Sequence, residues 1–139
     1  MRQTRRAVTN LMVAVNANKS LRKLRLWGPG YSLFEERGWR LLAQTLEKNS
    51  LVDLWVNNCE LDNTTFHFLS NALKHNTQLE ELWLEGNGLN DGSVCTLADD
   101  LKHNTTLRHL DLRHNSYGEE SRARLRQLLK HSQLLQVET

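Results

Sequence analysis

Few side chains in this 139-residue chain have the spacing that catalysis needs. The sequence contains no phosphate-binding loop, no H-E-x-x-H motif and no paired C-x-x-C. His75, His103 and His131 recur every 28 residues (103 − 75 = 28, 131 − 103 = 28) and could stack as metal ligands. A metal site needs three or four convergent ligands that are themselves held in place. We therefore interpret these histidines as solvated loop residues.

A second group, His109, Asp111 and His114, should lie together near the concave side, and we do not assign it a metal or acid–base role. Neither group predicts acid–base or metal chemistry. The sequence therefore predicts a protein that is not an enzyme and that has no metal and no cofactor.

The three tryptophans Trp27, Trp55 and Trp83 suggest binding chemistry instead, because each follows a leucine in a short alternating segment typical of a strand. An outward tryptophan leaves a large apolar area in water, and burying such an area is common at interface hot spots. The alternative is that tryptophan only suits a half-exposed strand. We favour a partner-binding surface that includes the neighbouring charged residues Arg25, Asp53, Glu81, Glu85, Asp111 and Arg113.

These residues are carried by a repeated pattern, L-x-x-L-x-L, that occurs four times. The copies begin at Leu21, Leu51, Leu79 and Leu107, at separations of 51 − 21 = 30, 79 − 51 = 28 and 107 − 79 = 28. A period in this range is typical of a leucine-rich solenoid, whose extended surface usually serves binding.

Each repeat has an alternating half that predicts a strand and a second half with apolar residues at helical spacing. Strand, helix and strand in register predict an α/β fold, a curved horseshoe with a parallel sheet on its concave side and helices on its convex side. The second and third leucines should face the core, and the residues between and beside them, His109 included, should face outward on the concave side. The predicted helical apolar sets are Val8, Leu11 and Val15; Trp39, Leu42 and Leu46; Phe66, Leu69 and Leu73; and Val94, Leu97 and Leu101.

Short polar residues mark the predicted helix starts. Ser32 with Glu35 forms a capping-box signature. Asp62 or Asn63, and Asn90 or Asp91, can cap the next two helices.

The repeats form one predicted domain, residues 1–139. It begins with the helical half of a repeat, which favours a piece of a longer array over a chain capped by its first helix. The predicted units are a partial repeat at 1–20, full repeats at 21–50, 51–78, 79–106 and 107–133, and a partial terminal strand at 134–139 that includes Leu134 and Val137.

The 28-residue unit with its full helix, and phrases such as Leu-Lys-His-Asn-Thr-Thr-Leu-Arg-His-Leu-Asp-Leu at 101–112, resemble the ribonuclease-inhibitor-like class of leucine-rich repeats. That class includes ribonuclease inhibitor, the repeat domains of NOD-like receptors and Ran GTPase-activating protein. The resemblance implies that Cys59, Asn87 and Asn115 bond turn backbone in a stacked ladder. Pro29, in the irregular turn of the first repeat, should break it.

The resemblance and the tryptophans together predict a non-catalytic module that recognises a protein partner on its concave face. By resemblance this is the ligand-sensing repeat region of a NOD-like immune receptor. The alternatives are a GTPase-activating protein similar to the Ran activator, and a scaffold that self-associates through open repeat ends.

Charge and cysteine content limit the partners and the location. Residues 1–34 contain seven basic residues and no acidic one, within a formal net charge of +2. No stacking aromatics accompany the first basic residues, so we do not expect nucleic acid as the partner. Only two cysteines predict a reducing, cytoplasmic location, and no apolar run approaches the ~20 residues that span a membrane.

Overall fold

The computed structural model describes residues 2–28, 32–48, 50–132 and 135–139. The predicted turn residue Pro29 and the predicted strand residue Leu134 lie outside these ranges. Helices and strands alternate along the chain. The helices are α1 (Arg2–Ala17), α2 (Glu36–Glu47), α3 (Asn63–His75), α4 (Asp91–Asp100), the short 3-10 helix η1 (Leu101–His103) and α5 (Glu119–His131). The strands are β1 (Lys23–Trp27), β2 (Asp53–Asn57), β3 (Glu81–Trp83), β4 (His109–Asp111) and β5 (Gln136–Glu138).

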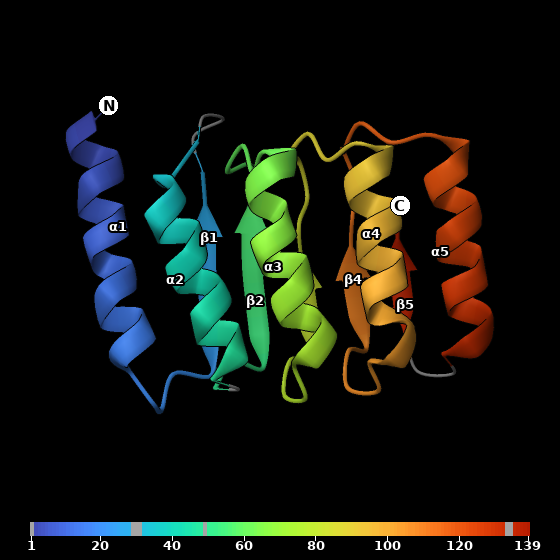
Figure 1. Ribbon diagram of the computed structural model, residues 1–139, viewed down its shortest axis with the longest axis horizontal. Coiled ribbons are helices and arrows are strands. Elements are labelled where there is room, and N and C mark those ends of the chain that lie inside the picture. The colour runs from blue at the N-terminus through green and yellow to red at the C-terminus, as the bar shows by residue number, and fades with distance from the viewer. Residues whose placement is uncertain (1, 29–31, 49, 133–134) are drawn as a thin grey trace.

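The five strands form one parallel sheet in the order β1-β2-β3-β4-β5. The helices lie side by side on one face of this sheet (Figure 1). Parallel strands need a crossover between them, and here each crossover is one helix. The predicted α/β arrangement of a parallel sheet with helices on one side is therefore confirmed, and it is compatible with a leucine-rich-repeat fold.

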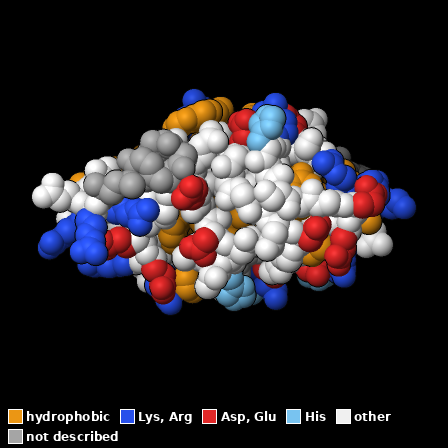
Figure 2. All heavy atoms as spheres, turned by 90° about the horizontal axis from the view of Figure 1, so that it is seen from above, with side chains coloured by type: hydrophobic (Ala, Val, Ile, Leu, Met, Phe, Trp, Pro, Cys, Tyr) orange, Lys and Arg blue, Asp and Glu red, His pale blue; other side chains and the backbone are white. Residues whose placement is uncertain are grey.

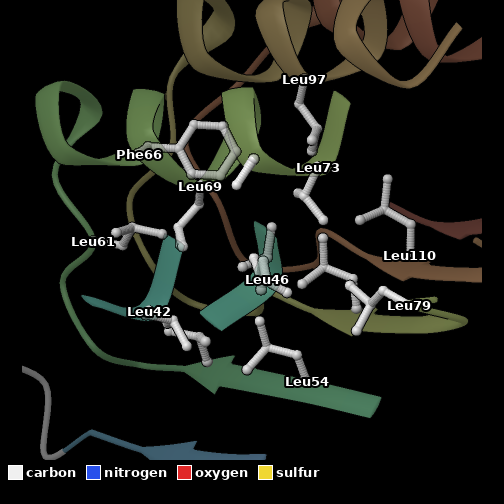
Figure 3. Close-up of a cluster of buried hydrophobic side chains, with 14 of the residues drawn as sticks. Leu42, Leu46, Leu54, Leu61, Phe66, Leu69, Leu73, Leu79, Leu97 and Leu110 are labelled. Carbon is white, nitrogen blue, oxygen red and sulfur yellow. The ribbon is translucent and has the colours of Figure 1, made fainter. Parts of the chain in front are cut away.

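The core lies between the sheet and the helices. Figure 3 shows leucines from strands and helices directed toward one another, among them Leu54 and Leu110 from strands and Leu69 and Leu97 from helices. These four side chains are at most 1% exposed. Full burial of one such side chain stabilises the fold by about 1.5–3 kcal/mol. The predicted core tryptophan Trp39 is also buried, at 1% exposure.

Polar side chains bond the starts of α3, α4 and α5, either from the same repeat or from the repeat before it. Asp62 accepts from Thr64 N and Thr65 N of its own helix α3. Asn63, in contrast, accepts from Asn90 N (3.1 Å) at the start of the next helix. Asn90 then caps α4, and its neighbour Asp91 reaches the start of α5. Neighbouring helices are thus tied together at their N-termini.

The capping box predicted at Ser32 and Glu35 is wrong. Glu35 occupies the N-cap position of α2 without a side-chain cap bond. Ser32 instead donates its backbone N–H to Glu60 Oε2 (3.0 Å) and its hydroxyl to the carbonyl of Phe34. The two extra residues of the first repeat move Ser32 out of the capping position.

The predicted apolar face of α1 is also only partly correct. Val15 is buried, but Leu11 is 53% exposed, and Met12 is buried in its place. Helix α1 packs against α2 on one side only, and among the described residues no strand lies under it. No helix in the described part of the chain is long and apolar enough to cross a membrane.

Candidate functional site

The side of the sheet that carries no helix is the candidate site, and we call it the open sheet face. Parallel register arranges its outward side chains in rows across the strands. The lower row contains Lys23, Asp53, Glu81, His109 and Gln136. The middle row contains Arg25, Trp55, Trp83, Asp111 and Glu138, and the upper row begins with Trp27 and Asn57.

A stacked array of four side chains crosses this face. The guanidinium carbon of Arg25 lies 4.4 Å from the ring centroid of Trp55. The Trp55 and Trp83 rings stack at 4.4 Å between centroids, with 25° between their planes. The Trp83 and His109 rings follow at 4.3 Å and 33°. Each ring limits the freedom of the next, so the array is a preorganised aromatic surface.

Strand register explains the array as far as Trp83. Arg25 is the register partner of Trp55, and Trp55 is that of Trp83. The register partner of Trp83 is Asp111, which is fully buried. Trp83 therefore stacks diagonally on His109 of the lower row. His109 was predicted to face outward but was not included in the partner-binding set, and its place in an outward row is the signal that could have found it.

Asp53 differs from the solvated charge that the sequence predicted. It is only 3% exposed, and its Oδ2 lies 3.3 Å from Arg25 Nη2 and 3.9 Å from Lys23 Nζ. Its Oδ1 has no hydrogen-bond partner among the described residues. Asp53 therefore lies beneath the surface and holds Arg25 over Trp55, so it offers no direct contact to a partner.

Asp111 is likewise a buried anchor and is not a surface charge. It accepts from the backbone N–H of Arg113 (2.9 Å) and from its guanidinium (2.7 Å to Nη2). Burial acts to raise the pKa of Asp111, but the hydrogen bonds and charge of Arg113 outweigh it and the pKa is lowered. Arg113 also lies 3.2 Å from Glu138 Oε2, and the pKa of Arg113 is raised chiefly by its bond to Asp111.

The remaining predicted charges border the array. Glu81 is exposed, and its Oε2 lies 3.4 Å from Trp83 Nε1. Glu85 is half-buried, 3.6 Å from His114 Nε2. A shallow hollow of about 410 Å³ lies beside the array, lined by Glu80, Glu81, Trp83, Arg108, His109 and Gln136.

Trp27 is separate from the array. It is 67% exposed, and its register partner is Asn57, which is buried. A tryptophan this exposed on an edge strand presents most of its ring to solvent. The structure thus separates the predicted set into a stacked pair, Trp55 and Trp83, and an isolated Trp27.

The three residues of the predicted ladder lie in successive turns. Asn87 Oδ1 accepts from Cys59 N (3.0 Å), and Asn115 Oδ1 accepts from Asn87 N (3.0 Å). The amide of Asn87 donates to Val56 O (2.6 Å), and that of Asn115 to Leu84 O (2.9 Å). In this ladder a side chain of one repeat bonds the turn of the repeat before it.

Cys59 has a different environment from the two asparagines. It is fully buried, with its Sγ 3.2 Å from Asn57 O, and burial raises the pKa of its thiol to about 12. The first repeat comes close to this turn through Gly28, where a Cβ would lie 2.2 Å from Asn58 O. Only glycine allows this approach of one backbone to the other.

No three His, Cys, Asp or Glu side chains gather into a metal-binding group within the described residues. The recurring His75, His103 and His131 are exposed, at or next to the ends of their helices.

The fold of this chain recurs among solved structures. No protein-family model matches this sequence, and no curated protein matches it. Among solved structures the chain is similar to the actin-binding site 2 of leiomodin-1, with a TM-score of 0.79 and 16% sequence identity. The likeness covers 93% of this chain and 76% of that chain. At this identity it shows a shared fold alone.

Proposed function

We propose that the chain is a non-catalytic module that binds a protein partner through the open sheet face, which we take as the concave side of a leucine-rich solenoid. The observation that carries the proposal is the array of Arg25, Trp55, Trp83 and His109. It spans four strands on the side of the sheet where the described residues place no helix. Rings held in place before binding lose little freedom when a partner covers them. Trp27 adds an exposed aromatic side chain to the same face.

Two further observations support the proposal. The similar leiomodin-1 structure is named for binding actin, so the shared fold is one that can bind a protein. Both cysteines in this chain are free thiols, which supports a cytoplasmic location. A role as the ligand-sensing region of a NOD-like immune receptor is the finer form of this proposal, and its support is the repeat sequence.

The proposal is tested by removing the stacked rings one at a time. We expect Trp55→Ala and Trp83→Ala each to weaken partner binding by about 2 kcal/mol, or roughly thirtyfold in Kd. Monomeric actin is the first probe, measured by calorimetry, and any partner identified by crosslinking can replace it.

A matched control is available on the helical side. Phe68→Ala removes an aromatic ring of α3 that lies 4.1 Å from the guanidinium carbon of Arg40, and it should leave binding unchanged. Circular dichroism should show all three variants folded. A partner that binds both tryptophan variants and the wild type equally would contradict the proposal.

A further inference from the structure

A groove between α4 and α5 lies on the helical side of the molecule, where the two helices pack side by side (Figure 1). It has a volume of about 660 Å³ and is lined only by residues of α4, η1 and α5. Ala98 and Leu128 line it and are buried, so its base is apolar. Because two neighbouring helices form both walls, the groove depends on neither edge of the sheet.

The preceding pair of helices, α3 and α4, has a carboxylate at the equivalent position. Ser70 of α3 donates to Asp100 Oδ2 (2.7 Å), and Lys74 Nζ lies 3.9 Å from Asp100 Oδ1. One repeat later (70 + 28 = 98, 100 + 28 = 128) the hydroxyl and the carboxylate are replaced by Ala98 and Leu128. The space between α4 and α5 is therefore apolar where the space between α3 and α4 is acidic.

The same change in sequence makes the groove basic. The two acidic residues that end α4, Asp99 and Asp100, correspond to Gln127 and Leu128 in α5 (99 + 28 = 127, 100 + 28 = 128). The Lys-His pair that follows them is repeated at residues 130–131. Helix α5 thus keeps the basic residues of the repeat and lacks both carboxylates.

Three cations and one carboxylate line the groove. The cations are Lys102, Arg124 and Lys130, and the carboxylate is Asp99. Asp99 Oδ1 lies 3.0 Å from Lys102 Nζ and 3.3 Å from Arg124 Nη1, and these side chains are between 43% and 57% exposed, so both ion pairs are weak in water. Lys130 is exposed and has no carboxylate partner in the described structure. With the histidines neutral, the groove carries a net charge of 3 − 1 = +2.

Basic residues in the last turn of a helix are common, because they face the negative end of the helix dipole. The last turn of α3 likewise contains Lys74. The helix dipole therefore explains Lys102 and Lys130. It does not explain Arg124, which lies in the middle of α5 at the position that Thr96 occupies in α4 (96 + 28 = 124).

The acidic residues of the helices lie mostly at their opposite ends. Figure 2 looks onto the helix N-termini and shows acidic side chains spread across this end of the molecule. In α5 these are Glu119, which pairs with Arg126, and Glu120. Glu120 precedes Arg124 by one turn but does not line the groove. An acidic partner is therefore repelled by the N-terminal end and attracted to the groove.

We propose that this groove binds an acidic segment of a protein partner, one that carries apolar residues among its carboxylates. An apolar side chain of the segment contacts Leu128, and its carboxylates pair with Lys130 and Arg124. The partner thus supplies the acidic group that Asp100 supplies between α3 and α4. Complementary charge of this kind speeds association and fixes the orientation of the segment. This inference goes beyond the proposed function, because it uses the helical side and leaves the stacked array free.

The apolar base of the groove favours a peptide over a nucleic acid. Single-stranded nucleic acids bind basic grooves through their phosphates and through bases that stack on aromatic rings. The described residues that line this groove include no Phe, Tyr or Trp. A peptide can place an apolar side chain and a carboxylate next to each other, which matches the lining.

The test is fluorescence anisotropy of a labelled peptide of glutamate and leucine, titrated with the full chain. One control peptide replaces leucine with serine, and the other replaces glutamate with lysine. Wild type should bind the glutamate–leucine peptide roughly tenfold more tightly than either control peptide. Wild type that binds none of the peptides, or that binds a control peptide equally well, overturns the inference.

Two variants test whether the peptide lies in the groove. Lys130→Glu reverses an exposed charge and should weaken binding of the glutamate–leucine peptide roughly tenfold. Gln127→Glu restores the acidic position of α4 and should weaken binding roughly threefold. Arg37→Glu is the matched control, because it makes the same change of charge at an exposed arginine in the first turn of α2 and should leave Kd unchanged. Circular dichroism should show all three variants folded.

Trp83→Ala should bind the peptide as wild type does, so failure of this inference and failure of the proposed function are distinguishable. Binding that is unchanged in both groove variants, or that Arg37→Glu weakens equally, overturns the inference. Loss of binding in Trp83→Ala would assign the peptide to the open sheet face and would also overturn it. A single-stranded oligonucleotide that binds more tightly than the peptide, and that Lys130→Glu weakens, would assign the groove to nucleic acid instead.

Discussion

The open sheet face has two kinds of residue: exposed side chains, and buried side chains that hold the exposed ones in place. Asp53 and Asp111 alternate correctly with the leucines, yet both are buried under arginines. A buried carboxylate is tolerated when hydrogen bonds and an opposite charge compensate its lost hydration. These two carboxylates therefore hold Arg25 and Arg113 in place, and the arginines and aromatic rings are the side chains of the proposed binding surface.

The environment of Asp111 predicts a pH dependence of stability. Its pKa is lower in the folded than in the unfolded chain, so its contribution is full above the unfolded value of about 3.9 and is lost as pH falls through the folded pKa. Asp111→Asn should lower the free energy of unfolding by about 1–3 kcal/mol at neutral pH. The loss should shrink below pH ~4, because wild type then loses the same interaction.

Urea denaturation between neutral and acid pH measures this difference. Glu80→Gln, at an exposed carboxylate, is the control and should follow wild type throughout. A difference between Asp111→Asn and wild type that stays constant across the whole pH range would show that the charge of Asp111 has no part in it.

At the scale of elements, the starts of α4 and α5 and the turns at Cys59 and Asn87 depend on a polar side chain from the neighbouring repeat. Asn63 and Asp91 bond the start of the following helix, and Asn87 and Asn115 bond the turn of the preceding repeat. The bonds of Asn87 and Asn115 satisfy turn N–H groups that are buried or partly buried. Stability is thus shared between neighbours, as in a repeat array.

The turn ladder predicts a large effect of one substitution. Asn87 is 5% exposed and bonds Cys59 N, Leu61 N, Val56 O and Leu84 O. Asn87→Ala removes this partner from Cys59 N, Leu61 N and Val56 O, at about 1–3 kcal/mol each, whereas Leu84 O keeps its bond from Asn115. We therefore expect a loss of about 3 kcal/mol or more.

Asn71→Ala is the matched control, because Asn71 is exposed on α3 and should cost little. Thermal or urea unfolding measures the free energy of unfolding of both variants. Equal stabilities for the two variants would mean that water replaces the ladder bonds without penalty.

Across the whole molecule, the two thiols report whether the repeats open together. Cys59 is buried with a pKa raised to about 12, whereas Cys95 is half-buried on α4. The thiolate is the reactive form. In native protein we expect a disulfide reagent to modify Cys95 and spare Cys59, and in denaturant to modify both.

The reactivity of the two cysteines is measured by counting modified thiols with mass spectrometry at increasing urea concentration. Cys59 should become reactive together with the loss of helical circular dichroism, since opening its turn requires separating three neighbouring repeats. The Cys95→Ser variant should show almost no native reaction. Rapid native modification of Cys59 would indicate that the ladder opens locally.

The repeat alone predicted the order of strands and helices, the parallel sheet and the buried leucines. This succeeded because apolar side chains are buried away from water, and their spacing along the chain determines which face of each strand or helix is buried. The outward position of Trp55 and Trp83 followed from the same alternation. Their stacking followed from adjacent strands in register.

Contacts between repeats were decided only by the tertiary structure. Periodicity gives the direction of a side chain but not its partner, so it could not show that Asp53 and Asp111 are buried or that His109 completes the array. It could not assign Asn63 and Asp91 to the next helix. It also placed Leu11 in the core, whereas Leu11 is largely exposed. Each of these contacts depends on a side chain of the neighbouring repeat, which comes close only when the chain is folded.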